Sequence, residues 1–108
     1  MLIFAWDDWN REYIGEHRVT VAEAEYVVRH AKPPFPREIE DDKQLVWGQT
    51  EAGRYLQVVF VFRAESEVEY ESLALEDILA LSDQDAPVVY VVHAMELTGR
   101  MKHQYRRL

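Results

Sequence analysis

Apolar and polar residues recur along the chain in two rhythms, one typical of helices and one typical of strands. In residues 7–17 the apolar side chains return every three or four positions, which predicts a helix with an aspartate cap and a buried stripe. The members of that stripe are Trp6, Trp9, Tyr13, Ile14 and His17. Thr20 and Glu23 have the spacing of a capping box and predict a second helix, which must end before the prolines at 33–36.

The strand rhythm is clearest in residues 45–62, LVWGQTEAGRYLQVVFVF, where two apolar runs flank a short turn. The second run is rich in β-branched and aromatic residues, and it is long enough to be the central strand of an antiparallel sheet. Gly53 is free to take the positive φ that closing such a turn often needs. Arg54 follows at once, so the hairpin presents one cation at the mouth of its second strand.

The second half of the chain continues with shorter signals. Residues 65–71 alternate acids with apolar side chains and predict a strand with one wet face, after which Ser72 is expected to cap a short helix. The continuous apolar run 88–92 predicts a strand that is covered on both faces and ends at His93. Thr98 is expected to cap a final helix that carries basic residues.

Together with a first or edge strand at residues 2–5, these elements predict an α+β fold. The expected arrangement has two N-terminal helices, a twisted antiparallel sheet of about four strands and a C-terminal helix. A length of 108 residues suits one hydrophobic core, so a single domain spanning 1–108 is expected.

The amino-acid composition limits which cofactors and which cellular location we expect for the protein. The chain has no cysteine and no histidine spacing typical of a metal site, so we expect neither a metal nor another cofactor. No apolar run approaches the roughly 20 residues of a membrane span, and the start lacks the basic segment of a signal peptide. These features predict a cytoplasmic protein without a membrane partner.

Charge is distributed unevenly. The formal net charge is −8. This argues against a general nucleic-acid binder, because the phosphates of nucleic acids bind best to a positively charged surface. Residues 97–108 nevertheless contain four cations and no acid. This basic tail is the segment suited to contact RNA or an acidic protein.

Three local patterns carry a family resemblance. They are FAWDDWN at residues 4–10 with His17 after it, WGQTEAGRYLQVVF at residues 47–60, and Thr98 followed by a basic stretch and Tyr105. In these patterns the chain resembles the BrnT-type toxins of bacterial toxin–antitoxin pairs. That resemblance implies a RelE-like fold, an endoribonuclease activity that needs no metal, and a BrnA-like antitoxin as partner.

The chain departs from the family pattern at three places. Met95 stands where the last strand usually has an arginine, Arg18 replaces the glycine that commonly follows the first histidine, and residues 66–86 form an insertion. A catalytically inactive protein-interaction module on the same fold is therefore the alternative to an active ribonuclease.

RNA cleavage on such a fold needs a base for the 2′-hydroxyl, a cation for the phosphorane and an acid for the leaving oxygen. Arg54 is the candidate cation, and its alternative role is an ion pair with Glu51 at the turn. His93 is the candidate base or acid, and its alternative is a partly buried histidine bonded to a neighbour. Tyr105, which resembles the family's C-terminal tyrosine, completes the candidate catalytic set or simply docks the last helix.

The candidate RNA-binding residues are His17, Arg100, Lys102 and Arg106. Arg100 and Lys102 in the first turn of a helix oppose its dipole, which predicts an anion at that helix start, either a phosphate or a partner's carboxylate. The alternatives are a frayed terminal helix and, for His17, packing on the helix stripe. Residues 66–86 either present a surface to a partner, a second copy of the chain included, or close the domain's own core.

Overall fold

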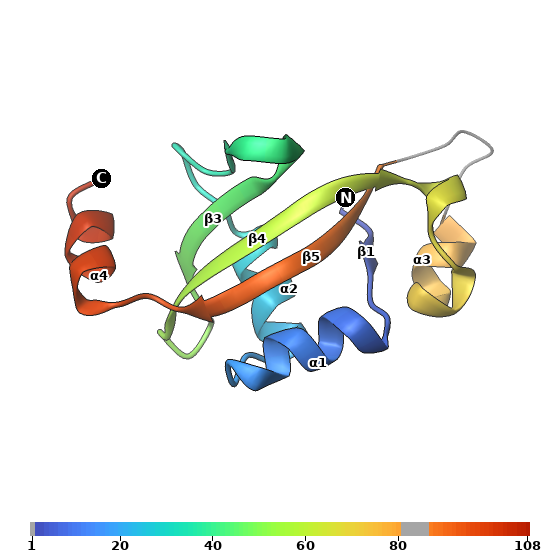
Figure 1. Ribbon diagram of the computed structural model, residues 1–108, viewed down its shortest axis with the longest axis horizontal. Coiled ribbons are helices and arrows are strands. Elements are labelled where there is room, and N and C mark those ends of the chain that lie inside the picture. The colour runs from blue at the N-terminus through green and yellow to red at the C-terminus, as the bar shows by residue number, and fades with distance from the viewer. Residues whose placement is uncertain (1, 81–86) are drawn as a thin grey trace.

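A computed structural model describes residues 2–80 and 87–108, which form an α+β fold with one sheet and four α-helices (Figure 1). The strands are β1 (Phe4–Ala5), β2 (Arg37–Glu38), β3 (Gln44–Gln49), β4 (Tyr55–Ala64) and β5 (Pro87–Glu96). The helices are α1 (Asp8–Glu16), α2 (Val21–Arg29), α3 (Leu75–Ala80) and α4 (Gly99–Arg106). None of the described helices is long and apolar enough to cross a membrane.

The sheet has five strands in the order β1-β5-β4-β3-β2. β1 runs parallel to β5, and the other neighbouring pairs are antiparallel. The α+β class is thus confirmed, whereas the sheet has one strand more than expected and is mixed instead of purely antiparallel. β1 lies within the strand expected at residues 2–5. β2 was not expected, because its two residues are too few to produce a periodic signal in the sequence.

The predicted hairpin is the centre of the sheet. β3 and β4 pair in register from Gln44 with Phe60 to Gln49 with Tyr55. Gly53 has a φ of 90° in the turn, as its position suggested, and its N–H donates to the carbonyl of Thr50 at 2.9 Å. β4 lies between β3 and β5, which confirms that the second strand of the hairpin is central.

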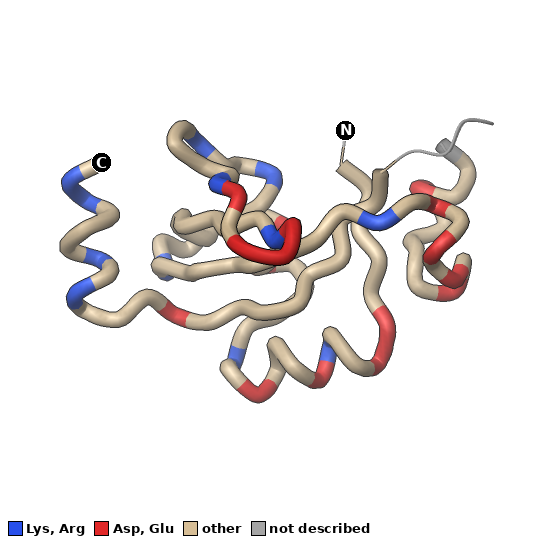
Figure 2. Tube along the Cα trace, turned by 45° about the horizontal axis from the view of Figure 1, so that its top comes forward, with Lys and Arg blue, Asp and Glu red and all other residues tan. Residues whose placement is uncertain are grey.

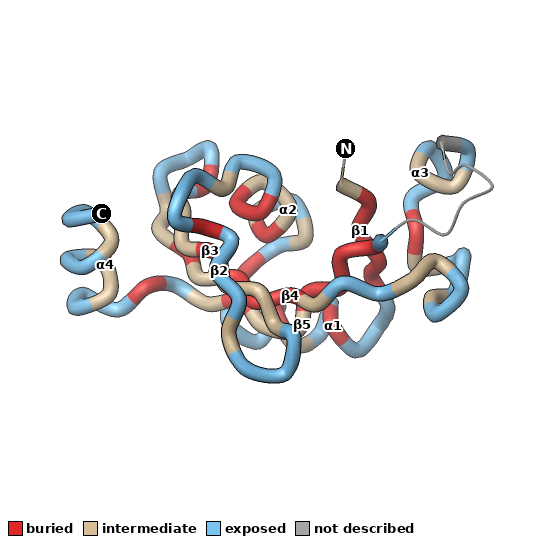
Figure 3. Tube along the Cα trace, turned by 90° about the horizontal axis from the view of Figure 1, so that it is seen from above, coloured by how far each residue is buried: buried red, intermediate tan, exposed pale blue. Residues whose placement is uncertain are grey.

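The two N-terminal helices cover the sheet in different ways. α2 lies behind the sheet in the view of Figure 1, whereas α1 lies along β5, and none of the described α-helices lies in front of the strands. The predicted capping box of Thr20 and Glu23 is present, and Asp7 and Asn10 form a second one at α1. Seen from above, the buried residues concentrate where the strands meet these two helices (Figure 3).

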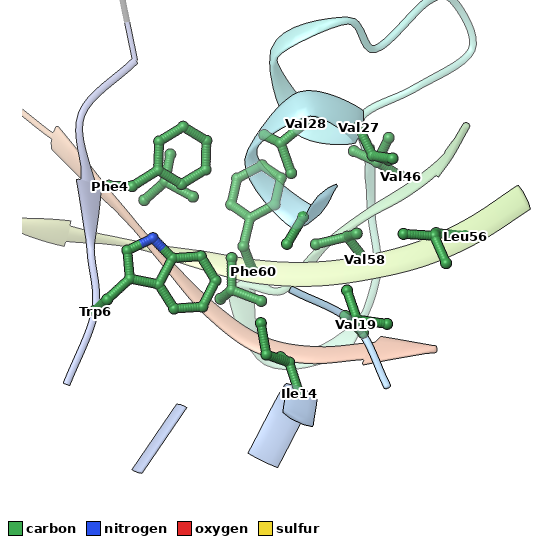
Figure 4. Close-up of a cluster of buried hydrophobic side chains, with 14 of the residues drawn as sticks. Phe4, Trp6, Ile14, Val19, Val27, Val28, Val46, Leu56, Val58 and Phe60 are labelled. Carbon is green, nitrogen blue, oxygen red and sulfur yellow. The ribbon is translucent and has the colours of Figure 1, made fainter. Parts of the chain in front are cut away.

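One hydrophobic cluster fills the space between α2, α1 and the sheet (Figure 4). Ile14 of α1 and Val27 of α2 contribute to it from the helices, and β4 contributes every second residue. The β4 members are Leu56, Val58 and Phe60, which are at most 2% exposed. The opposite face of β4 carries Tyr55, Gln57 and Val59, because side chains alternate along a strand.

The expected buried stripe of α1 is partly wrong. Trp9 is 56% exposed and His17 is exposed, while the buried residues of this helix are Asn10 and Ile14. The reason is the position of α1 beside β5, which lets one side of the helix fill the core while Trp9 stacks on Tyr13 with ring centroids 5.4 Å apart.

Residues 65–71 do not form the expected strand. They form two 3₁₀ turns, η2 (Glu65–Glu67) and η3 (Tyr70–Ser72). The carboxylate of Glu67 accepts a hydrogen bond from the N–H of Ala64 at 2.8 Å and so ends β4. Ser72 does not cap α3 either, because its hydroxyl donates to the carbonyl of Glu69 at 2.6 Å and closes η3.

This segment closes the edge of the domain through Leu73. Leu73 is 7% exposed and belongs to a second hydrophobic cluster on the face of β5 opposite α2. The other buried members are Ile3, Ala5, Val88 and Tyr90. Leu75 and Leu79 are 68% and 77% exposed, and residues 81–86 of the expected insertion lie outside the described residues.

We therefore expect Leu73→Ala to lower the free energy of unfolding by about 2–4 kcal/mol, the usual cost of emptying a buried leucine site. Leu75→Ala and Leu79→Ala serve as matched controls and are expected to stay within about 0.5 kcal/mol of the parent chain. Urea denaturation followed by tryptophan fluorescence measures all three. Equal losses at Leu73 and Leu75 would show that Leu73 is not the residue that anchors the segment.

Candidate active site

β5 contains an irregularity that decides where His93 points. The strand does not end at His93 as expected but continues to Glu96, because it pairs with β4 along its whole length. Phe60 pairs with Val91 and Val59 pairs with His93, so Val92 is an extra, bulged residue. Without it, His93 would share the core-facing side of Val91. The bulge turns His93 to the opposite face, and bulges of this kind often re-aim side chains next to active sites.

The bulge brings His93 to the end of α1, where His17 caps the helix. The two imidazole rings are 5.4 Å apart between centroids and meet edge to face. The ring of Tyr13 lies 5.8 Å from His17 and 5.9 Å from His93, so three rings form one cluster. Two candidate residues 76 positions apart in the sequence are thereby placed side by side.

The protonation state of His93 is biased by its surroundings. Burial lowers the pKa of His93 below its ordinary value of 6.5, and the neighbouring His17 lowers it further. His93 is therefore neutral at neutral pH and has an imidazole nitrogen able to accept a proton. His17 is exposed beside it.

Arg54 lies near the same corner of the fold, but its guanidinium is occupied. Nε donates to Glu96 at 2.8 Å, and Nη1 donates to Glu23 at 2.9 Å and to the carbonyl of Arg18 at 2.7 Å. The alternative role, an ion pair with Glu51, is not what the structure shows, because the carboxylate partners of Arg54 are Glu23 and Glu96. Arg54 lies two residues before Leu56, whose neighbour on β5 is Glu96, so its side chain extends toward β5 and α2 instead of toward the turn. Arg54 thus connects β4, β5 and the turn between α1 and α2.

This network shifts the pKa values of its members. The hydrogen bond to Glu96 raises the pKa of Arg54, outweighing burial, and Glu23 raises it further. Burial by itself would raise the pKa of Glu23, but hydrogen bonds from Thr20 and Arg54 outweigh burial and hold that pKa below 4.5. Two carboxylates facing one guanidinium make a poor phosphate clamp.

We expect Arg54→Ala to lower the free energy of unfolding by about 1–2 kcal/mol, a value kept small because the carboxylate of Glu96 is more than half exposed. Arg100→Ala, which removes an exposed cation from α4, is the control and should be near neutral. Denaturation at several pH values tests in which direction the stability loss of Arg54→Ala changes with pH. The Glu23 contribution is present above pH 4.5 and is lost as the pH falls through the lowered pKa, so the deficit of Arg54→Ala should shrink in acid.

α4 carries the remaining candidate residues to a different part of the surface. The ring of Tyr105 lies 6.0 Å from that of Tyr55 and 6.4 Å from that of Phe35, which supports its role in docking the helix. Lys102 Nζ and Arg106 Cζ lie 5.7 Å and 5.2 Å from the centroid of the Tyr55 ring. No contact between described residues joins Tyr105 to His93.

The start of α4 follows the sequence prediction. The hydroxyl of Thr98 accepts a hydrogen bond from the N–H of Met101 at 3.2 Å, and Arg100 is exposed in the first turn. The cations of α4 lie at one end of the molecule, and the acids of residues 65–77 lie at the other (Figure 2). Beside Tyr105, a cleft of about 390 Å³ is lined by His30, Lys32 and Trp47 among others.

The candidate residues therefore fall into three groups instead of one. His17 and His93 face each other, and Arg54 is bound by carboxylates. Tyr105, Lys102 and Arg106 gather at Tyr55, while Arg100 is exposed in the first turn of α4. The sequence did not indicate Tyr13 as a partner of both histidines. Its spacing of four residues from His17 on one helix face was the available signal.

Comparisons with models of protein families, with curated proteins and with solved structures find no match to this chain. The functional assignment consequently rests on the geometry of the site and on the sequence patterns.

Proposed function

We propose that this chain is a BrnT-like toxin with a RelE-like fold, an endoribonuclease that needs no metal, acts in the cytoplasm and is inhibited by a BrnA-like antitoxin. The observation that supports this proposal is the pair formed by His17 and His93. Two imidazoles in contact supply the base and the acid that cleavage at a ribose requires.

The reaction has one proton entering and one leaving. Neutral His93 takes the proton of the 2′-hydroxyl, and the 2′-oxygen attacks the adjacent phosphorus. The bond to the 5′-oxygen breaks, and that oxygen takes a proton from the imidazolium form of His17. The products are a 2′,3′-cyclic phosphate and a 5′-hydroxyl, and the two histidines have exchanged protonation states.

The face of the sheet opposite α2 offers a path for the RNA strand. His93 pairs with Val59, and Tyr55 is on the same face of β4 because side chains alternate along a strand. Tyr55 and Val59 are four positions apart, roughly 13 Å at the usual rise of a strand. Lys102 and Arg106 lie close to the Tyr55 ring, so cations of α4 are suited to bind the RNA backbone at a distance from the histidine pair.

An antitoxin that covers the α4 cations with acidic side chains competes for the same contacts. The engagement of Arg54 by Glu23 and Glu96 favours a second candidate, an inactive protein-interaction module on the same scaffold. The two candidates differ in whether RNA is cleaved.

The test uses purified protein and single-stranded RNA in a buffer with a metal chelator. We expect cleavage that leaves 2′,3′-cyclic phosphate and 5′-hydroxyl ends, and growth arrest when the chain is expressed alone in a bacterial host. An RNA of the same sequence with a 2′-deoxyribose at the cleaved position is the matched control and should stay intact. RNA that is intact in both cases, with harmless expression, leaves only the interaction module.

A further inference from the structure

Arg18 occupies a backbone position that glycine fills most easily. Its φ is 59°, in the left-handed region where a side chain collides with the following carbonyl. The position is the first residue beyond the cap of α1. The N–H of Arg18 donates to Gly15 at 2.9 Å and that of Val19 to Ile14 at 3.1 Å, the hydrogen-bond pattern of a Schellman motif. Helices that end in this way usually have glycine where this chain has arginine.

The strained conformation is held in place by the Arg54 network. Nη1 of Arg54 donates to the carbonyl of Arg18 at 2.7 Å, while Glu23 and Glu96 fix the same guanidinium. Strained residues that their surroundings hold in this way are found preferentially at functional sites. Arg54 therefore acts on the turn as a positioning residue.

The position of Arg18 in the sequence places it beside the histidine pair. It directly follows His17, whose ring is 5.4 Å from that of His93. Its side chain is exposed, and no hydrogen bond or ion pair engages its guanidinium among the described residues. Arg54, by contrast, has two carboxylate partners. A free guanidinium next to an acid–base pair is suited to bind phosphate oxygens with two parallel hydrogen bonds.

We propose that Arg18 is the phosphate-binding cation of this site. Its guanidinium binds the two non-bridging oxygens of the scissile phosphate and stabilises the charge that they gain when the 2′-oxygen attacks. This inference rests on the proposed ribonuclease function and adds the third group that the reaction requires. On this proposal, the strained left-handed conformation of Arg18 is tolerated because it places a cation beside His17.

The test compares Arg18→Gly with Arg18→Lys in RNA binding, cleavage and thermal unfolding. Arg18→Gly relieves the backbone, so its melting temperature should rise, while kcat/KM for RNA should fall at least tenfold. Removing one phosphate contact should also reduce the slope of log affinity against log salt by roughly one. Arg18→Lys keeps the charge but not the paired hydrogen bonds, so its rate should be intermediate.

Two controls separate backbone and charge effects. Asp42→Gly relieves a φ of 59° in a distant loop and should raise the melting temperature without slowing cleavage. Arg11→Ala removes one exposed cation from α1 and should change kcat/KM by less than about threefold. If Arg18→Gly cleaves RNA at the parent rate, or if its activity falls together with its melting temperature, the role of Arg18 is wrong while the ribonuclease stands. If the parent chain neither binds nor cleaves RNA, both proposals are wrong.

Discussion

Asn10→Ala is expected to lower the free energy of unfolding by about 3–5 kcal/mol, the largest stability loss we expect from a single polar substitution. The side chain of Asn10 is 0% exposed. Its Nδ2 donates to the carbonyls of Ala5 at 3.1 Å and Val91 at 3.2 Å, and its Oδ1 accepts from the N–H of Asp7 at 2.8 Å. Alanine removes three hydrogen bonds at once, and each polar group left without a partner in the interior costs about 1–3 kcal/mol.

The position of Asn10 explains why no apolar residue can replace it. β1 pairs with β5 only at Val89 and Tyr90, so the carbonyl of Val91 lies just past the last pair of the two strands. Asn10 supplies the donor that a longer β1 would have supplied. The amide thus joins α1 to the edge of the sheet across 81 positions of sequence.

Chemical denaturation measures this prediction against two further variants. Asn10→Asp has nearly the same shape but directs a carboxylate at two carbonyl oxygens, so its loss should equal or exceed that of alanine. Glu12→Ala, on the exposed side of the same helix, should stay within about 0.5 kcal/mol. A loss below 1 kcal/mol for Asn10→Ala would mean that water replaces the amide and that the bridge is not structural.

Asn10 also marks the limit of what the sequence could predict about the fold. The capping box of Thr20 and Glu23, the Gly53 turn and the cap at Thr98 depend on residues a few positions apart, and all three are confirmed. The bridge from Asn10 to Val91 depends on two strands meeting, which no local pattern encodes. The strand predicted from the alternation in residues 65–71 is wrong for the same reason. A strand needs a neighbouring strand to pair with, and these residues follow the end of β4.

In the candidate site, too, local patterns indicated single residues but not the tertiary contacts between them. His17 and His93 were candidates as separate residues, but their contact depends on a single bulged residue that the apolar run 88–92 conceals. Arg54 was correctly placed at the start of its strand, yet its availability was not predictable, because Glu23 and Glu96 come from an earlier helix and a later strand. Residue type therefore indicated candidate chemistry, and tertiary pairing decides which of the candidate residues are free of other partners.

His93→Ala is expected to lower RNA cleavage by about 10²–10⁴-fold, the usual contribution of a general base. RNA affinity should be nearly unchanged, because this histidine is neutral and the proposed phosphate contacts are made by other residues. Tyr13→Phe is the matched control, since it retains the ring packed against both histidines and should cleave at close to the parent rate. Single-turnover kinetics with chelator present separate the chemical step from binding.

The role of His93 as a base also predicts the direction in which the cleavage rate changes with pH. His93 works as a base only when neutral, so cleavage falls as the pH drops through its pKa. Because burial and His17 hold that pKa below 6.5, the acid limb of the rate profile should also lie below 6.5. His17→Gln removes the neighbouring charge and should move the pKa of His93 upward, which an NMR titration of the His93 ring measures without any activity.

The two measurements together identify the base. A His93 that titrates above 6.5 in the parent chain, or a pKa that does not move in His17→Gln, would contradict the contact on which the mechanism depends. A His93→Ala variant that cleaves at the parent rate would remove His93 from the reaction even if the titration behaves as expected. Only a base that is both electrostatically coupled to His17 and required for the rate satisfies both results, and the bulge at Val92 is the feature of the fold that places His93 in that position.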